Sequence, residues 1–541
     1  MVIKILLPYD NMIPPAIVPI FVNTGVALLP MIVGALAGVA AVIFNPRELL
    51  RLCRRRPVVS MVVILGALVI WFCVPPLIAA LRADKSFRRS GPNEIDWAKV
   101  ALEILRSDQR AAVAASAFDS PSDTDPGQVM ARIYRGSMSR DGYSGGDSPR
   151  GLVPVWEYEQ DDTMYPSSPI VVGGAVYGAS CLLDPPDTYG AIFCLDARTG
   201  AERWYTDVKD PDSDEEFRGF FSSPAVSADG RYLVIGQGMH FDEDCELVCL
   251  DAATGEVHWL IKTTLHIEGS PAIEGDIVVA GAGAIEVGDD QKAKGDPGFV
   301  MGVRLSDGEE LWRYPLNDPE SSPAVDNGVS YIGSGVNGSA VVALRTESDA
   351  QLEEEGLDRL IWKTPTPHPA TGAITLTENL VLIGCGNSNY IFIAENPEGF
   401  VLALDRKTGK LLWQVPVPDA VLGAIAVRGN TAICPVRNGE VVAIDLSRSG
   451  EIIWRQQVSG SSPVLAGPAF TDELVYAVSQ DGYLVVLDAS DGSQIERHYV
   501  NAPGNPGELG LSVSSPFVVG GRVYVGSETG GLRCFAGTKG K

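Results

Sequence analysis

The residue types that most often carry out chemistry are present in this sequence, but they are not grouped. The five histidines are His240, His258, His266, His368 and His498. They form no HExxH pair, and the nine cysteines contain no CxxC, so the sequence shows neither a zinc-protease helix nor a zinc ribbon or c-type haem motif. The acidic loops at 210–217 and 241–246 lack the DxDxDG spacing of a calcium loop. We therefore expect no catalytic, cofactor-binding or metal-ligating residues.

The overall charge narrows the choice of partner. The 541 residues carry a formal net charge of −26, and the sequence pI is about 4.6. Binding to a nucleic-acid phosphate backbone depends on a basic protein surface, which displaces the counterions condensed on the nucleic acid. Nucleic acid is therefore not an expected partner.

A ten-residue pattern recurs along most of the chain. "LDARTGAERW" at 195–204 returns as "LDAATGEVHW" at 250–259 and "LDRKTGKLLW" at 404–413. A run of apolar and β-branched residues leads to Asp, then Thr-Gly, then Trp four residues later. Asp and Thr can bond the turn backbone and Gly supplies positive φ, so each copy predicts a strand, a tight turn and a second strand.

Counting the copies predicts the architecture. Strand pairs such as "SSPIVVGGAVYGAS" precede each copy, and eight such units can be counted. The seventh unit has Glu496 where Trp is expected, and the eighth stops before its fourth strand. Trp156, ahead of the first complete unit, fits that missing strand, which would close a ring and remove exposed sheet edges. The sequence predicts an all-β fold: an eight-bladed β-propeller of four-stranded blades.

The repeated tryptophans are expected to be structural. They are Trp156, Trp204, Trp259, Trp312, Trp362, Trp413 and Trp454. A four-stranded blade buries little by itself, so an indole at each junction supplies apolar contact with the next blade. Cysteines have a similar role in this interpretation, because Cys194, Cys249 and Cys534 share one repeat position with small apolar residues. A disulfide between Cys181 and Cys194 is the alternative.

The N-terminal part differs in character from the repeats. Residues 16–44 and 57–81 are uncharged and longer than the roughly 20 residues that cross a bilayer. They predict a two-helix transmembrane anchor over 1–82, followed by a helical and polar linker over 83–131 and the propeller over 132–541. Five arginines between the spans favour a cytoplasmic loop, although basic residues at 82–89 favour the opposite orientation. We expect a multi-pass inner-membrane protein with a periplasmic or other extracytoplasmic propeller.

The repeat resembles a known family. A strand followed by "LDxxTGxxxW" resembles the PQQ-like, quinoprotein-type β-propeller repeat over about 132–537, and "RIYRGSMSRDGYSG" at 132–145 resembles the lead-in of such propellers. One branch comprises dehydrogenases that hold pyrroloquinoline quinone on calcium in the propeller funnel. The other comprises BamB-like scaffolds of the outer-membrane assembly machine, which bind proteins. The adjacent cysteine pair, the haem motif and a matching calcium and base set of the dehydrogenases are not found, which favours a scaffold without a cofactor.

Two groups of residues are candidates for an interaction surface. His266, Glu268 and Glu320 precede first strands and could line a funnel mouth, although ordinary loop polarity explains them as well. Tyr390 and Phe392 lie in the apolar segment "YIFIA", which is either an exposed loop that contacts a partner or an extra buried strand. We expect a non-enzymatic, membrane-anchored interaction module with protein partners in the cell envelope. The alternatives are a divergent quinoprotein dehydrogenase, with PQQ and calcium, and a propeller that binds cell wall or carbohydrate.

Overall fold

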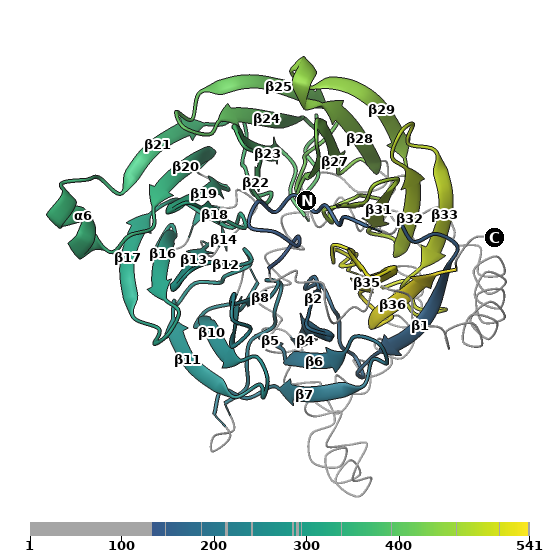
Figure 1. The fold of residues 1–541 in the computed structure, drawn as a ribbon, viewed down its shortest axis with the longest axis horizontal. Coiled ribbons are helices and arrows are strands. Elements are labelled where there is room, and N and C mark those ends of the chain that lie inside the picture. The colour runs from purple at the N-terminus through teal and green to yellow at the C-terminus, as the bar shows by residue number, and fades with distance from the viewer. Residues whose placement is uncertain are drawn as a thin grey trace, which may run out of the picture. The chain divides into compact units, whose positions relative to one another are not determined.

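A computed structural model describes most of the repeat region. It covers residues 133–538, apart from 147, 185–186, 211–214, 240–241, 284–285, 288–291, 294, 337, 391, 461 and 508. The predicted spans and linker lie outside the described residues, so the domain boundaries at 82 and 131 stay predictions. The described chain forms eight four-stranded antiparallel sheets around a channel, with the first strand of each sheet innermost (Figure 1). The prediction of an eight-bladed propeller of four-stranded blades is confirmed.

The first four blades follow one another in chain order. Blade 1 consists of β2 (Ile170–Val172), β3 (Ala175–Ala179), β6 (Ile192–Asp196) and β7 (Glu202–Thr206). Blade 2 consists of β8 (Ala225–Val226), β9 (Tyr232–Gly236), β10 (Glu246–Asp251) and β11 (Val257–Lys262). Blade 3 consists of β12 (Ala272–Glu274), β13 (Ile277–Ala282), β16 (Phe299–Arg304) and β17 (Glu310–Pro315). Blade 4 consists of β18 (Ala324–Asp326), β19 (Val329–Ser334), β20 (Ala340–Arg345) and β21 (Leu360–Pro365).

The last four blades complete the ring. Blade 5 consists of β22 (Thr375–Leu376), β23 (Leu380–Gly386), β24 (Gly399–Asp405) and β25 (Leu411–Val417). Blade 6 consists of β26 (Ala426–Arg428), β27 (Thr431–Pro435), β28 (Glu440–Asp445) and β29 (Glu451–Gln457). Blade 7 consists of β30 (Ala469–Phe470), β31 (Leu474–Ser479), β32 (Tyr483–Asp488) and β33 (Gln494–Tyr499). Blade 8 consists of β34 (Phe517–Val519), β35 (Arg522–Gly526) and β36 (Leu532–Gly537). Its fourth strand is β1 (Leu152–Tyr158), which precedes blade 1 in the sequence.

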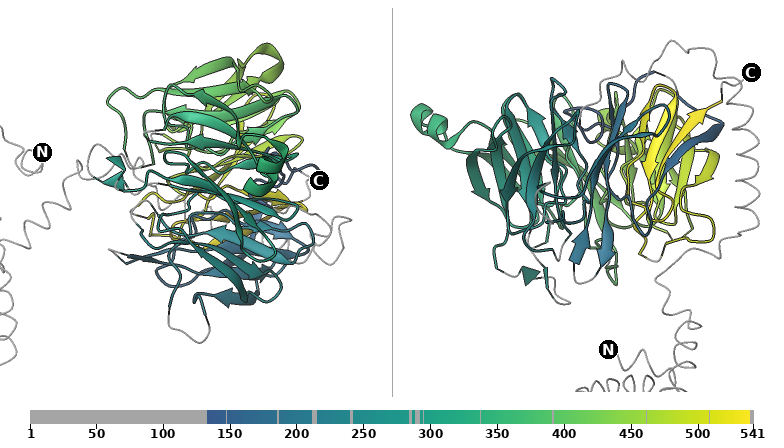
Figure 2. Two further views of the ribbon diagram at one scale, coloured as in Figure 1. Left: turned by 90° about the vertical axis from the view of Figure 1, so that its left-hand side faces the viewer. Right: turned by 90° about the horizontal axis from the view of Figure 1, so that it is seen from below.

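A few elements lie outside the blades. Two short hairpins are formed by β4 (Leu182–Asp184) with β5 (Asp187–Tyr189), and by β14 (Glu286–Val287) with β15 (Lys292–Ala293). Helix α6 (Asp349–Glu355) projects from the rim of blade 4, and the 3₁₀ turn η3 (Leu446–Arg448) lies in blade 6 (Figure 2).

The predicted multi-pass inner-membrane location is corrected here. Within 133–538, none of the described helices has the length and apolar character required to cross a membrane. The only α-helix in this part of the chain is α6, which has seven residues and is rich in Glu. The segments on which that prediction rested, 16–44 and 57–81, lie outside the described residues.

The repeated Thr-Gly and Trp meet across each blade junction. The Nε1 of Trp204 donates to the carbonyl of Ala252 in the next blade, at 3.1 Å, and the ring lies against Gly255 in the same turn. A Cβ on Gly255 would lie 2.5 Å from the ring, and its φ of +77° also favours glycine. Equivalent contacts join Gly200 to Trp156, Gly308 to Trp259, Gly409 to Trp362, Gly450 to Trp413 and Gly492 to Trp454. Five of the seven predicted tryptophans are buried, and Trp156 and Trp413 are half-buried.

One junction uses a different residue against the indole. Between blades 3 and 4 the tight turn is replaced by the longer segment that contains α6. The guanidinium of Arg359 there lies 4.5 Å from the centre of the Trp312 ring, and Trp312 still donates to the Thr346 carbonyl at 2.9 Å. A cation–π contact thus takes the place of the glycine contact.

The ring closes through the predicted N-terminal strand. Strand β1 pairs with β36 in antiparallel register, with Trp156 opposite Cys534. Blade 7 carries Glu496 at its Trp position, and the carboxylate accepts hydrogen bonds from the backbone N–H groups of Gly151 (2.8 Å) and Leu152 (3.1 Å). The Nε2 of His498 lies 2.9 Å from the same carboxylate. Glu496 therefore anchors the start of β1.

The N-terminal lead-in crosses the channel before it joins the ring. The backbone carbonyls of Ser139, Asp141 and Gly142 accept hydrogen bonds from N–H groups at the inner strands of blades 5, 6 and 7, respectively. Arg140, which is fully buried, donates to the carbonyls of Ser270 (2.8 Å), Pro271 (3.0 Å) and Pro323 (2.5 Å). Burial lowers the pKa of Arg140 to about 9, which still leaves the guanidinium charged at neutral pH.

The junction contact generates a stability prediction. In Gly255→Ala the new methyl group would meet Trp204, whereas in Gly275→Ala it would meet nothing within 4 Å, although both glycines have positive φ. We expect the control to lose roughly 1 kcal/mol from backbone strain, and Gly255→Ala to lose about 1–3 kcal/mol more from overpacking. Urea unfolding would measure both. Equal losses in the two variants would contradict the indole–glycine contact.

The closing strand generates a prediction on pH. Burial tends to raise the pKa of Glu496, but the hydrogen bonds from His498, Leu152 and Gly151 outweigh it and lower that pKa. The resulting stability is therefore present above the unfolded pKa of about 4.3 and is lost as pH falls through the lower folded pKa.

At pH 7 we expect Glu496→Gln to lose roughly 1.5–3 kcal/mol, because charged hydrogen bonds are lost. The gap from the unsubstituted protein should narrow progressively as pH falls below about 4.3 and through the lower folded pKa. The matched control is Glu473→Gln, whose exposed carboxylate pairs with Arg150. Melting curves from pH 3 to 8 would check this, and a gap that has the same size at pH 3 as at pH 7 would contradict it.

Candidate functional site

A small cavity lies in the channel where the loops that precede the inner strands converge. Its volume is about 140 Å³. Serines and small apolar residues just ahead of the inner strands form much of its wall. The acidic and aromatic residues that line it are Tyr134, Phe221, Glu268, Glu320 and Tyr390. The cavity therefore contains three of the residues that the sequence pointed to, from three different blades.

His266 joins this group from behind the cavity wall. It is fully buried, and its Nε2 lies 3.1 Å from Oε1 of Glu320. Asp318, which the sequence analysis did not single out, is buried beside them, and one ligand atom from each of the three side chains lies within 4.8 Å of the others. One imidazole and two carboxylates are the described residues of this site that could hold a metal ion. The signal for Asp318 was its place two residues before Glu320, ahead of a first strand.

The segment "YIFIA" is a loop in the described residues. No strand covers 390–394, as far as these positions are described, so the extra-strand alternative is not observed. Tyr390 packs on the apolar cluster of Ala420, Leu422 and Leu465 at the cavity. Burial raises its pKa, as do the nearby Tyr134, Glu268 and Glu320. Phe392 is not in the cavity: 54% of its surface is exposed, and Ile393 beside it is 46% exposed.

Hydrogen bonds hold this loop in one shape. Asn389 accepts from the backbone of Phe392 through its side chain (2.6 Å) and donates its own N–H to the Phe392 carbonyl (3.0 Å). Asn387 accepts from the Glu398 N–H at 2.7 Å and so ties the two ends of the loop together. The guanidinium of Arg437 donates to the Asn389 carbonyl at 2.6 Å. The apolar tip is thus presented on a fixed base.

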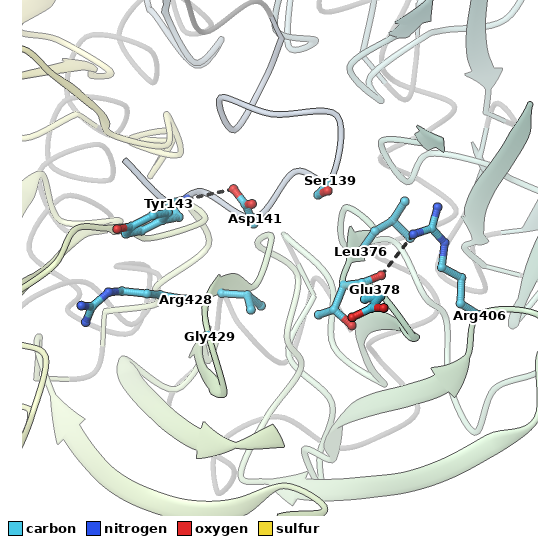
Figure 3. A pocket seen from close by; sticks show the side chains of 10 residues that line it. Ser139, Asp141, Tyr143, Leu376, Glu378, Arg406, Arg428 and Gly429 are labelled. Atoms are coloured by element: carbon cyan, nitrogen blue, oxygen red, sulfur yellow. Dashed lines mark hydrogen bonds between the residues drawn. The ribbon is translucent and has the colours of Figure 1, made fainter. Parts of the chain in front are cut away.

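A second hollow, of about 560 Å³, lies at the opposite end of the inner strands (Figure 3). Asp141 and Tyr143 of the lead-in form one side, and the turns after β22 and β26 form the other. Its two arginines are already paired, since Arg406 bonds Asp326 and Arg428 lies 3.2 Å from Asp472. Arg406 also donates to the Thr377 carbonyl at 3.2 Å. These charges serve contacts within the protein.

The remaining described histidines and cysteines that the sequence analysis considered do not join the cavity cluster. His258 contacts the Ser306 carbonyl and His368 contacts Glu398, both in exposed settings. His240 lies outside the described residues. Cys181 and Cys194 are both free and buried.

The cavity does not fit the quinone cofactor that the resemblance implies. Ligand pockets typically measure about 300–1,000 Å³, and this cavity is smaller. Pyrroloquinoline quinone carries three carboxylates, whereas the wall carries Glu268 and Glu320 and, among its described residues, neither lysine nor arginine. Like charges in such a confined site repel one another.

A family model matches most of the propeller. It is described as outer membrane protein assembly factor BamB, and it matches residues 188–294 and 298–541. The chain belongs to this family. BamB of Yersinia pestis is 24% identical over 363 residues, which cover 64% of this chain and 80% of that protein. The dehydrogenase subunit of the quinone alcohol dehydrogenase of Gluconobacter oxydans is 26% identical over 289 residues, which cover 48% of this chain and only 33% of that protein.

Solved structures show the same fold in both groups. BamB from Moraxella catarrhalis has a TM-score of 0.52 at 15% identity and covers 71% of this chain and 99% of its own. The quinohemoprotein alcohol dehydrogenase of Comamonas testosteroni has a TM-score of 0.55 at 17% identity and covers 80% of this chain and 85% of its own. These likenesses establish the propeller fold and do not by themselves choose between the two functions.

Proposed function

We propose that the chain is a protein-binding scaffold of the cell envelope, which holds a protein partner at the mouth of its channel. The observation that carries this proposal is the loop 387–398, with exposed Phe392 and Ile393 on a hydrogen-bonded base. Aromatic and aliphatic side chains on an ordered loop are favourable interface anchors, because little backbone freedom is lost on binding. Tyr390, half-buried in the cavity wall, packs on the apolar cluster beneath the same loop.

The shape of the channel agrees with a scaffold. The lead-in crosses it at one end, and the cavity at the other end is small. Apart from the hollow beside the lead-in, what remains accessible is the rim of loops, where sequence can vary without loss of the blades. The family name and the similarity to BamB of Yersinia pestis support a role alongside other proteins.

A quinoprotein dehydrogenase is the second candidate function. It is favoured by the similarity to the Gluconobacter oxydans enzyme and by the fold shared with the Comamonas testosteroni enzyme. The size and charge of the cavity argue against it. A carbohydrate-binding propeller would be favoured by an open groove lined by aromatic side chains. No such groove is found among the described residues.

The scaffold proposal predicts where a partner can be captured. A photo-crosslinking residue at position 392 in cells should yield a discrete protein adduct. The same residue at position 412 should not, although Leu412 on the outer strand β25 is 48% exposed. The double change Phe392→Ser and Ile393→Ser should weaken capture of that protein about tenfold or more and leave the melting temperature nearly unchanged.

The matched control is the double change Leu411→Ser and Leu412→Ser, which removes a similar exposed apolar area from β25. It should leave capture intact. The proposal is wrong if the β25 variant weakens capture while the loop variant does not.

A further inference from the structure

The cluster of His266, Asp318 and Glu320 has the composition of a metal site. One ligand atom from each side chain lies within 4.8 Å of the others, before any ion draws them together. Ligands around a tetrahedral ion at about 2.0–2.2 Å lie roughly 3.3 Å apart. The 3.1 Å between His266 Nε2 and Glu320 Oε1 already matches that separation. Asp318 needs only a small side-chain movement to complete the set.

The backbone around the cluster holds these side chains in place. The N–H of Val336 donates to Oδ2 of Asp318 at 2.7 Å, and the N–H of Gly335 donates to the Asp318 carbonyl at 2.7 Å. The N–H of Gly283 donates to the His266 carbonyl at 2.9 Å. The bond from Val336 orients the Asp318 carboxylate itself, as hydrogen bonds made behind a ligand do in metal sites. The other two bonds fix the backbone that carries Asp318 and His266.

Two glycines keep the space beside the ligand atoms open. A Cβ at Gly283 would lie 2.5 Å from Nε2 of His266 and 2.9 Å from Cγ of Glu320. A Cβ at Gly335 would lie 2.3 Å from Oδ2 of Asp318. Neither glycine is among those with positive φ, so backbone conformation does not explain them. A side chain at either position would occupy the space in which an ion would be bound.

The electrostatic setting favours a cation. Glu320 lines the cavity together with Glu268, and the described lining residues include no lysine or arginine. The side chains of His266 and Glu320 are 0% and 8% exposed, so water screens their charges little. Buried carboxylates are costly unless a proton, a cation or hydrogen bonds compensate for their charge.

We propose that His266, Asp318 and Glu320 bind one divalent transition-metal ion, for which Zn²⁺ is the probe. An imidazole with two carboxylates favours Zn²⁺ over the all-oxygen preference of Ca²⁺. On binding, the contact between His266 Nε2 and Glu320 is replaced by a bond from each to the ion. The imidazole binds in its neutral form through Nε2, with its proton on Nδ1. The ion links the loops ahead of blades 3 and 4, and the cavity side remains for a water or a partner's ligand atom.

The test is a metal titration of the full chain after chelator treatment. Isothermal titration and melting curves with Zn²⁺ should show one equivalent bound and a raised melting temperature. Ca²⁺ should bind at least tenfold more weakly. Asp318→Asn and Glu320→Gln, which keep the side-chain size, should each weaken Zn²⁺ binding at least tenfold. The matched control is Glu398→Gln, which removes the carboxylate from the other inter-loop histidine pair, His368–Glu398, and should leave binding unchanged.

Two results would overturn the proposal. One is the absence of stoichiometric Zn²⁺ binding to the unsubstituted chain, and the other is binding that Asp318→Asn and Glu320→Gln leave intact. If those variants do not fold, Co²⁺ binding to the unsubstituted chain decides. Visible absorption of a low-symmetry Co²⁺ site with a nitrogen ligand supports the proposal, and the spectrum of hydrated Co²⁺ alone rejects it.

Discussion

The structure depends on one contact, in which an indole of one blade lies against a glycine turn of the next. This contact explains why Thr-Gly and Trp recur together: the glycine lets the indole approach, and the turn carbonyl accepts its N–H. Each blade buries its apolar faces only on its neighbours, so the ring is as stable as its junctions. The exceptions follow the same requirement. Between blades 3 and 4, a longer segment that contains α6 replaces the turn, and Arg359 lies over Trp312. Between blades 7 and 8, Glu496 accepts a hydrogen bond from the backbone at the start of β1.

Much of the channel inside this closed ring is filled by the protein's own residues. The lead-in crosses the channel, and Arg140 is held by carbonyls from blades 3 and 4. At the other end, Tyr390, Leu422 and Leu465 reduce the channel to a small cavity with an acidic wall. The loops are therefore the exposed part of the molecule whose sequence can vary without loss of the fold. This arrangement suits the proposed scaffold. A buried ion at His266 would strengthen the same loops rather than open a reaction site.

Much of this fold could be predicted from the sequence, because the repeat contains its own turn chemistry. The positions of Gly and Trp gave the number of blades, and the shortfall at the eighth blade gave the closing strand with Trp156. The role of Glu496 could not be predicted, because its partners are backbone N–H groups 344 and 345 residues away along the chain. Arg140 was missed for the same reason, because its carbonyl partners lie in blades 3 and 4. Asp318 was missed because His266, its partner in the cluster, belongs to the preceding blade.

The candidate site was foreseen only in part. The position of Glu268 and Glu320 before first strands placed them at the channel, since all first strands surround it. That Tyr390 would enter the same cavity while Phe392 points away depends on the hydrogen bonds of one loop, which no periodicity encodes.

The central claim, that the chain is a scaffold rather than a quinoprotein enzyme, is tested most directly by equilibrium binding of pyrroloquinoline quinone to the full chain in the presence of Ca²⁺. The account predicts no saturable binding by quinone absorbance and no reduction of an artificial electron acceptor with alcohols or sugars. Stoichiometric quinone binding accompanied by acceptor reduction would contradict it.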